Sequence, residues 1–452
     1  MNIVSQEKVA VVGMGKTGLS VVRHLQRKHI DCECFDEAAV QLPSDLQHIT
    51  LHVGALDNEA VFIGFDKVIV SPGIDWRHPA LVEARKCGVQ VHGDLDEFLA
   101  SYSGTLIAVT GTNGKTTATQ MIALLLETLP KGCDAGGNIG VPMLDLLAEG
   151  QPERVALELS SFQLERAKNL HPHYAVLLNV QSDHEDMHDS PEAYRAAKVR
   201  MFQHMIVGDT ALLLQTDEWR DLAADLQGRG VTVKRFGIVE NMDDAVAGVM
   251  CAEAGDVLFW HQGDMRRTVA CSSLMVRGSH QQQNIAVAAQ VAADFNVPAA
   301  VIEEALMSFQ GLEHRLEFVG HIQGRDWFND SKATNPNAAI AALTSFAQVM
   351  WICGGVRKGL ALDDLVDVVR QHVCFACVIG EDTQAYEDVL NQAGIPFVVS
   401  KTVAQAVIDA QDHDSDAPVL LSPAAASQDQ YRHYAERGAD YVQAIRGLGD
   451  ES

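Results

Sequence analysis

The sequence has no long hydrophobic run and no cysteine framework. No apolar stretch approaches the roughly 18–20 residues that a membrane-spanning helix needs. The first residues, MNIVSQEKVAVVG, lack the basic segment and the small-residue cleavage pattern of a secretory signal. Cysteines number 9, an odd count at scattered positions, which does not suit a disulfide scaffold. We therefore expect a soluble, cytoplasmic protein.

Positive charge is also scarce. Lys and Arg total 34 against 60 Asp and Glu, which gives a net charge of -26. Nucleic acids and anionic membranes bind basic surfaces, so we expect neither as a partner. We also expect small-molecule substrates and a monomeric chain. Any anionic substrate must be held by local donors, which makes each lysine or arginine in a glycine-rich loop informative.

The chain has 452 residues, 47% of them hydrophobic, which suits about three globular domains. Strands alternate with helical segments along three stretches, a pattern typical of parallel α/β sheets. Between Val231 and Val276, short β runs with Gly-Asp turns indicate an added antiparallel meander. We predict an α/β chain of three domains, each a mainly parallel sheet with flanking helices: Rossmann-like (1–93), P-loop ATPase-like with the meander (94–311) and Rossmann-like (312–452).

We expect each sheet to contain several short strands. In the first domain they span Lys8–Val12, Cys32–Phe35, Lys67–Val70 and Val89–His92, with a helix at Leu19–Lys28. In the second they span Leu106–Thr110, Val155–Leu159 and Ala175–Val180, with helices at Ala118–Leu129, Pro191–Phe202 and Asn284–Asp294. In the third they span Val349–Cys353, Ala376–Ile379, Phe397–Ser400 and Val419–Leu421.

Two glycine-rich loops follow strands. Gly13–Gly18 reads GxGxxG, and Asp36 ends the next strand, where a ribose-binding acid would lie. This loop fits a nicotinamide or flavin dinucleotide, or a nucleotide-shaped fold that binds another ligand. The second loop, TGTNGKTT at Thr110–Thr117, shares the GK[ST] end of a P-loop but has Val109 where that pattern has glycine. Its backbone N–H groups, Lys115 and Thr116 still suit a nucleoside triphosphate with Mg²⁺.

Other polar groups fall at strand ends, where parallel sheets place ligand-binding residues. In the central domain these are Glu158, His184 and, on a helix, Lys198, a set that could hold a second Mg²⁺. In the last domain, the loops NDSKATN, GGVRKG and LSPAAAS bring two lysines and several hydroxyls to one sheet edge. Such a cluster suits a small dicarboxylate.

Two motifs are judged to be misleading. His184–His188 matches HExxH, but it follows a strand among aspartates and precedes Pro191, so a zinc protease is disfavoured. Cys374 and Cys377 form a CxxC inside an apolar run, which indicates a buried strand and not a redox or metal site.

Seven segments together resemble the Mur ligase family: GTNGKTT, GGNIGVP, ELSSFQLE, YRAAK, GLEHR, NDSKATN and LSPAAASQDQ. Their order and spacing are similar to its D-glutamate-adding branch, and the resemblance covers nearly the whole chain. It implies an ATP-dependent ligase that joins D-glutamate to UDP-N-acetylmuramoyl-L-alanine through an acyl phosphate, in peptidoglycan precursor synthesis. ATP and Mg²⁺ are the implied cofactors.

The resemblance also implies residue roles. The UDP-sugar would contact Gly15, Thr17, Asp36, Gly73 and Asn138. ATP would contact Gly111, Thr112, Asn113, Gly114, Lys115, Thr116, Thr117, Asn284, Arg315 and Asp330. The amino acid would contact Lys332, Thr334, Lys358, Ser427 and Tyr434. The metal ligands would be Thr116, Glu158, His184 and Lys198 as a carbamate, and the catalytic residues Lys115, His184 and Lys198. Two positions depart from the family pattern: Ala38 replaces an arginine and Tyr434 a phenylalanine.

Several alternatives remain open from the residues. The chain could add L-alanine or a diamino acid, although the Asp-Asn-Pro-Arg segment of the diamino-acid branch is absent from the sequence. It could be a folylpolyglutamate synthetase, which shares the loop pattern. More remote are an NAD-dependent oxidoreductase and a non-catalytic nucleotide-binding regulator.

Overall fold

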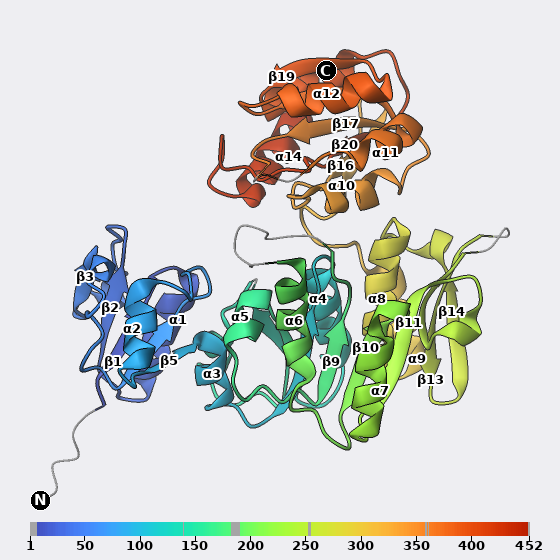
Figure 1. The fold of residues 1–452 in the computed structure, drawn as a ribbon. Helices are drawn as coiled ribbons and strands as arrows, with labels where there is room; N and C mark the ends of the chain where they lie inside the picture. Colours follow the sequence, from blue (N-terminus) through green and yellow to red (C-terminus); the bar gives the residue numbers. More distant parts are fainter. Residues whose placement is uncertain are drawn as a thin grey trace, which may run out of the picture. The chain divides into compact units, whose positions relative to one another are not determined.

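The computed structural model describes residues 7–138, 140–181, 190–251, 255–357, 359 and 361–450 (Figure 1). It contains three sheets, of five, nine and six strands. The predicted α/β class with three mainly parallel sheets is confirmed. The chain also divides into two compact units. The first unit comprises Met1–Gly237, Asp243–Val246 and Ala288–Pro298. The second unit comprises Ile238–Met242, Ala247–Val287 and Ala299–Ser452.

The first sheet is parallel throughout, in the order β3-β2-β1-β4-β5. Its strands are β1 (Val9–Val12), β2 (Cys32–Asp36), β3 (Leu51–Val53), β4 (Lys67–Val70) and β5 (Gln90–Gly93), with helices α1 (Lys16–Arg27), α2 (Pro79–Lys86) and α3 (Asp94–Leu99). Successive side chains of a strand point to opposite faces. Val9 and Val11 accordingly pack in one core with α1 and α3, and Ala10 and Val12 pack with α2. Both faces are covered, as parallel sheets require.

The second sheet has the order β14-β13-β12-β11-β10-β9-β6-β8-β7. Its strands are β6 (Thr105–Thr110), β7 (Asp134–Gly137), β8 (Arg154–Glu158), β9 (Tyr174–Leu177), β10 (Thr210–Leu214), β11 (Thr232–Val239), β12 (Ala247–Met250), β13 (Val257–Gln262) and β14 (Met265–Ala270). The antiparallel meander is present, because β13 pairs antiparallel with β12 and β14. The β11 strand, which we expected in the meander, instead pairs parallel with β10.

Six helices belong to this part of the chain. They are α4 (Lys115–Leu126), α5 (Ser161–Arg166), α6 (Pro191–Val199), α7 (Arg220–Gly228), α8 (Ser279–Asp294) and α9 (Ala299–Ser308). The α4, α6 and α8 helices differ from the predicted bounds, and α8 starts at Ser279, five residues before Asn284. The α4 helix starts three residues before Ala118, directly behind Gly114, and α6 gives way to a 3₁₀ turn at Arg200–Phe202.

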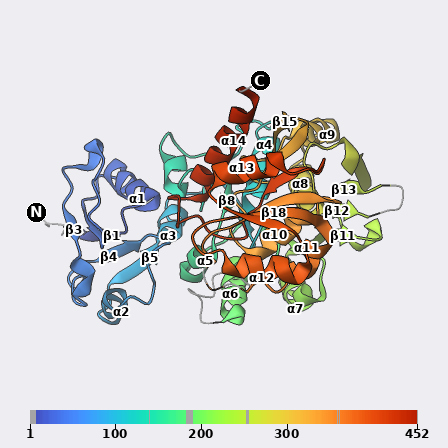
Figure 2. The same ribbon diagram turned by 90° about the horizontal axis from the view of Figure 1, so that it is seen from above.

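The third sheet has the order β15-β16-β20-β17-β18-β19. Its strands are β15 (Glu317–Ile322), β16 (Arg325–Asn329), β17 (Val349–Gly354), β18 (Val373–Ile379), β19 (Phe397–Lys401) and β20 (Val419–Leu421). Figure 2 shows α10 (Pro336–Leu343), α11 (Leu365–His372) and α12 (Gln384–Ala393) on one side of it and α13 (Val403–Asp412) and α14 (Tyr434–Asp450) on the other. Cys377 is buried in β18, as the interpretation of the CxxC as a strand predicted.

Within the described residues, no helix has both the length and the hydrophobicity needed to cross a bilayer. The HExxH segment, His184–His188, lies outside the described residues.

Candidate active site

A cavity of about 310 Å³ lies beside the first glycine-rich loop. It is lined by Gly13, Gly15, Lys16, Thr17, Asp36, Ser71, Pro72, Gly73, Ile74, Asn138 and Gln163. Every residue predicted to contact the UDP-sugar is therefore among those that line this cavity. The α1 helix begins at its edge, and its N-cap residue Gly15 provides no side-chain cap, so the first N–H groups of α1 remain available to an anion such as a diphosphate.

The geometry of this loop depends on two glycines and an aspartate. Gly13 has φ of +88°, in the left-handed region that favours glycine. A Cβ on Gly18 would lie 1.8 Å from the carbonyl oxygen of Gly13, so only glycine fits there. Asp36 accepts hydrogen bonds from the backbone N–H groups of Met14, at 2.6 Å, and Ala38, at 3.0 Å. Its carboxylate thus shapes the loop as well as lining the cavity.

The second glycine-rich loop wraps the start of α4. Gly114 has φ of +84° and provides no side-chain cap. The ammonium of Lys115 folds back onto the loop and donates to the carbonyl oxygens of Gly111 and Thr112, at 2.9 and 2.8 Å. Asn179, at the end of β9, accepts hydrogen bonds from the N–H groups of Thr112 and Asn113 through its side chain. Backbone donors and an ammonium at a helix N-terminus form a phosphate-binding arrangement.

Glu158 contacts both the second glycine-rich loop and a residue that lines the first cavity. Its Oε2 accepts a 2.6 Å hydrogen bond from the hydroxyl of Thr116, and its Oε1 a 3.4 Å hydrogen bond from Asn138, which lines the cavity. The predicted phosphate-binding and UDP-sugar residues therefore meet at one buried carboxylate. Lys198, only 1% exposed, donates to the carbonyl oxygen of Gly111 at 2.8 Å and lies over the ring of Tyr194.

The hydroxyl of Thr116 and the carboxylate of Glu158 are oxygen donors of the kind that Mg²⁺ prefers, so this pair fits the expected metal. Among the described residues, no group of three or more His, Cys, Asp or Glu is arranged to hold a metal ion. His184 and Lys358 lie outside the described residues, so their predicted roles stay predictions.

In the last domain, the described residues of the predicted amino-acid site follow the ends of β16 and β20. The ammonium of Lys332 lies 4.0 Å from the centre of the Tyr434 ring. Ser427 is 2% exposed, and its hydroxyl has no hydrogen-bond partner among the described residues. Thr334 follows in the same loop as Lys332, two residues along and partly buried.

The predicted ATP contacts Asn284, Arg315 and Asp330 also belong to the second unit. Asn284 is buried on α8. Asp330 is buried and accepts hydrogen bonds from the hydroxyl of Ser422 and the N–H of Leu316. Burial raises the pKa of Asp330 to about 7, although both hydrogen bonds favour the charged form.

Arg437, which is 1% exposed on α14, was not among the predicted site residues. Its guanidinium donates to the hydroxyl of Ser331 at 3.0 Å and to the carbonyl oxygens of Ser331 and Ala425, at 2.8 and 3.0 Å. It thus connects the loops that carry Lys332 and Ser427. Burial lowers its pKa to about 10. No local pattern could have identified it, because its partners lie up to 106 positions away in the sequence.

Other missed residues lie in segments that the sequence did single out. Gln163, within ELSSFQLE, lines the first cavity, and Tyr194, within YRAAK, has its hydroxyl 3.1 Å from that of Thr112. Their side-chain types alone did not separate them from core residues.

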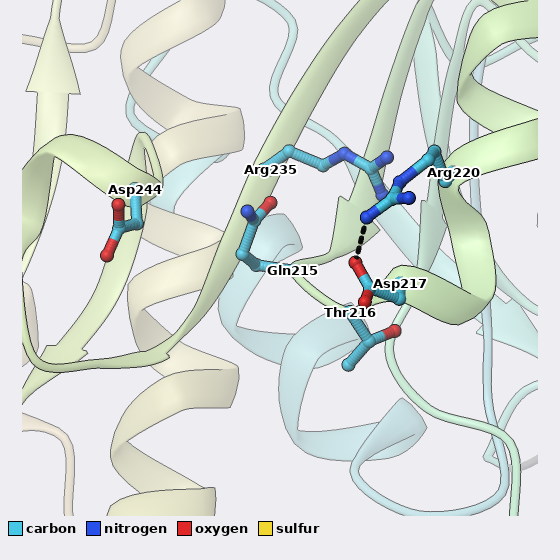
Figure 3. Close-up of a pocket in the computed structure, with 6 residues that line it drawn as sticks. All are labelled: Gln215, Thr216, Asp217, Arg220, Arg235 and Asp244. Atoms are coloured by element: carbon cyan, nitrogen blue, oxygen red, sulfur yellow. Dashed lines mark hydrogen bonds and ion pairs between the residues drawn. The ribbon is translucent and has the colours of Figure 1, made fainter.

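A second cavity, of about 590 Å³, lies beside β10, α7 and β11 (Figure 3). It is lined by Gln215, Thr216, Asp217, Arg220, Arg235 and Asp244. Asp217 pairs with Arg220, and Arg235 donates to the carbonyl oxygens of Leu214 and Trp219. Its charged groups are thus largely satisfied by the protein itself, and none of the predicted site residues among the described ones lines it.

Three family models match the chain. They are the MurD-like N-terminal domain of Mur ligases at residues 7–93, the Mur ligase middle domain at 109–292 and the Mur ligase glutamate ligase domain at 314–425. The chain is also 33% identical to the UDP-N-acetylmuramoylalanine–D-glutamate ligase of Methylococcus capsulatus, over 98% of this chain and 95% of that protein. The enzyme of the same name from Pseudomonas aeruginosa is 34% identical over 97% of both chains.

The chain belongs to the Mur ligase family. The predicted family and enzyme class, an ATP-dependent amino-acid ligase, are thereby confirmed. Solved structures of Mur ligases share the fold. The alanine ligase MurC from Thermotoga maritima has a TM-score of 0.61 at 18% identity and covers 97% of this chain and 99% of its own. MurF from the same organism, in complex with ADP, has a TM-score of 0.61 at 18% identity. The match covers 99% of this chain and 96% of the MurF chain.

Proposed function

We propose that this Mur ligase joins D-glutamate to UDP-N-acetylmuramoyl-L-alanine with hydrolysis of ATP to ADP and phosphate, in the cytoplasmic synthesis of peptidoglycan precursors. The observation that carries the proposal is the position of Glu158. Its carboxylate contacts Thr116 in the phosphate loop and Asn138 in the cavity beside the first loop. A phosphate donor at one loop and a carboxylate acceptor in the cavity would therefore meet at this residue.

We assign the domains as predicted: residues 1–93 bind the UDP-sugar, 94–311 bind ATP, and 312–452 bind the amino acid. The GxGxxG loop would then hold a uridine diphosphate and not a nicotinamide dinucleotide. The cavity supports this assignment, because it combines the open start of α1 with side chains of the ATP-binding domain, Asn138 and Gln163. We expect the chain to act as a monomer, which light scattering coupled to gel filtration would test.

The proposed mechanism has two steps. In the first, a carboxylate oxygen of the L-alanine unit attacks the γ-phosphorus of ATP, so that ADP leaves and an acyl phosphate forms. Lys115 and the backbone N–H groups of its loop would bind the phosphate oxygens and reduce repulsion between the two anions. Thr116, Glu158, His184 and a carbamate on Lys198 would hold Mg²⁺, which when bound neutralises charge on the phosphate oxygens.

In the second step, the amine of D-glutamate attacks the acyl carbon. A C–N bond forms, the C–O bond to phosphate breaks, and the amine loses a proton, for which His184 is a candidate acceptor. Lys332, Thr334, Lys358, Ser427 and Tyr434 would bind and orient the amino acid. Their position in the last domain would allow the enzyme to select the amino acid separately from the first step.

Release of ADP with ATP, Mg²⁺ and UDP-N-acetylmuramoyl-L-alanine tests the proposal directly. The acceptors to compare are D-glutamate, L-glutamate, L-alanine and a diamino acid. We expect turnover with D-glutamate only. Turnover with another acceptor would assign the chain to another branch of the family. No turnover with any of them would show the nucleotide-sugar assignment to be wrong, and a folate substrate would be tested next.

A further inference from the structure

Arg166, the last residue of α5, reaches the loop that forms one wall of the first cavity. Its guanidinium donates to the carbonyl oxygen of Ser71 at 2.9 Å and to that of Ile74 at 2.6 Å. Both acceptors line the cavity, together with Pro72 and Gly73 between them. Arg166 itself is 5% exposed and does not line the cavity. Arg166 therefore contacts the residues of the cavity wall without lining the cavity itself.

The loop that Arg166 holds is in turn bonded to the GxGxxG loop. The hydroxyl of Ser71 donates to the carbonyl oxygen of Gly13 at 2.8 Å, and that same oxygen lies against Gly18. A shift of Ser71 would therefore also move the glycine loop, which lines the same cavity. Within the loop, the N–H of Ile74 donates to the carbonyl oxygen of Ser71 at 3.2 Å. The oxygen of Ser71 thus accepts from both Ile74 and Arg166.

Two groups beside Arg166 stabilise its buried charge, although its Nε has no hydrogen-bond partner among the described residues. Its guanidinium carbon lies 5.1 Å from the centre of the Trp76 ring. Asp94, buried at the start of α3, supplies the opposite charge and accepts a 3.1 Å hydrogen bond from Gln163. Burial raises the pKa of Asp94 to about 6 and lowers that of Arg166, while the charge of each group opposes the shift of the other.

The α5 helix has only 6 residues, and its N-terminus is stabilised by side-chain hydrogen bonds. Ser160 and Gln163 form a capping box, in which each side chain bonds the backbone N–H of the other residue. Gln163 also lines the cavity. The stretch from Glu158 to Arg166 therefore contacts the phosphate loop at one end and the cavity wall at the other.

We propose that Arg166 is a positioning residue for the nucleotide-sugar substrate, which holds the Ser71–Ile74 loop in the conformation that binds the UDP moiety. The inference rests on the proposed function. A guanidinium suits this task because its two Nη groups reach two carbonyl oxygens at once, which the single ammonium of a lysine does less well.

Calorimetric binding of UDP and of UDP-N-acetylmuramoyl-L-alanine tests this proposal, together with separate Michaelis constants for the three substrates. We expect R166Q to weaken both affinities about 10-fold, the equivalent of about 1.4 kcal/mol, because it removes at least one charge-assisted hydrogen bond. The Michaelis constants for ATP and D-glutamate and the kcat should change less than about threefold. R166K, which retains the charge, should show an intermediate affinity and provides the test if R166Q does not fold.

Arg85 provides a matched control. Its guanidinium also lies over Trp76, at 4.7 Å, but it donates to the carbonyl oxygen of Trp76, which does not line the cavity. R85Q should lower the Tm yet leave UDP affinity within about twofold of the wild type. Wild-type UDP affinity in R166Q or R166K, or a parallel change in all three Michaelis constants, would overturn the role of Arg166. A wild-type protein that binds neither UDP ligand would instead refute the proposed function, and the inference with it.

Discussion

The hydroxyl of Thr116 donates a 2.6 Å hydrogen bond to the carboxylate of Glu158, and both side chains are buried. The hydroxyl comes from the first turn of α4 and the carboxylate from the last residue of β8. Two oxygen donors are thereby fixed at the start of a helix, beside the loop proposed to bind phosphate.

Replacement of Thr116 by valine should lower kcat/KM for ATP at least about 100-fold, since the shape is kept and the hydroxyl is lost. The loss corresponds to about 2.7 kcal/mol of transition-state stabilisation. Thr116→Ser keeps the hydroxyl and should stay within about tenfold of the wild type. Steady-state kinetics with varied ATP and Mg²⁺ measure both. Equal activity of the valine and serine variants would contradict a ligand role for Thr116.

Replacement of Lys198 by alanine should abolish activity, because no carbamate can form on alanine. If the carbamate is the functional group, added short carboxylic acids such as acetate or propionate should restore part of the activity by occupying the same space. ADP release with and without the acid measures the rescue. Near-normal activity of Lys198→Ala without added acid would refute the carbamate role.

Replacement of Asp330 by asparagine should change how stability depends on pH. Burial raises the pKa of Asp330 from 3.8 to about 7, so the folded state binds a proton there that the unfolded state has released. This group therefore favours folding fully below pH about 4, and its contribution is lost as the pH rises to 7, by up to about 4 kcal/mol. Urea unfolding across pH 4–8 should show a smaller loss with rising pH in the variant. An identical pH profile would contradict the raised pKa.

Replacement of Arg437 by methionine should raise KM for the amino acid at least about tenfold, because two loops of the amino-acid site lose their shared donor. The KM for the nucleotide-sugar should change little. The matched control is Arg432→Gln, since Arg432 is exposed on the segment before α14. If the methionine variant kept the wild-type KM for D-glutamate, Arg437 would be a structural residue only.

Alanine substitutions at Gly18 and Gly15 should have very different effects on the free energy of unfolding. An alanine at 18 would place its Cβ 1.8 Å from the oxygen of Gly13, whereas nothing lies within 4 Å of a Cβ at 15. Gly18→Ala should cost at least about 3 kcal/mol of unfolding free energy, and Gly15→Ala should change it by less than about 1. Thermal unfolding without substrate compares them. Similar Tm values for the two variants would show that the loop can rearrange.

The sequence patterns predicted those strands whose formation depends on adjacent residues in the chain. The strands at Lys67–Val70 and Val419–Leu421 were predicted to the residue, because each is a short apolar run ended by a Ser-Pro turn. The β7 strand was not predicted, since Asp134–Gly137 reads DAGG and forms a strand only by pairing with β8. The β15–β16 hairpin was also missed, although Gln323 and Gly324 at its turn both have positive φ, as tight hairpin turns require.

The candidate site divides in the same way. Glycine loops and strand-end polar groups are local signals, so five residues of the first cavity could be named from the sequence, although Gln163 of the same cavity was missed. Arg166 and Arg437 bind carbonyl oxygens of segments 92 to 95 and 12 to 106 positions away, respectively. Every residue has a backbone carbonyl oxygen, so the residue types give no indication of which one an arginine binds. No pattern in one sequence could therefore connect Arg166 or Arg437 with its partners.

The junction between β5 and α3 has a consequence for protein engineering. Gly93 ends the strand and Asp94 begins the helix, with no linker between them. Asp94 and Arg166 both lie beyond residue 93, yet the loop they support lies before it. A chimera that exchanged residues 7–93 with those of a relative would therefore separate the loop from its support. Grafts of this first module should succeed more often when the α5 helix is transplanted along with it.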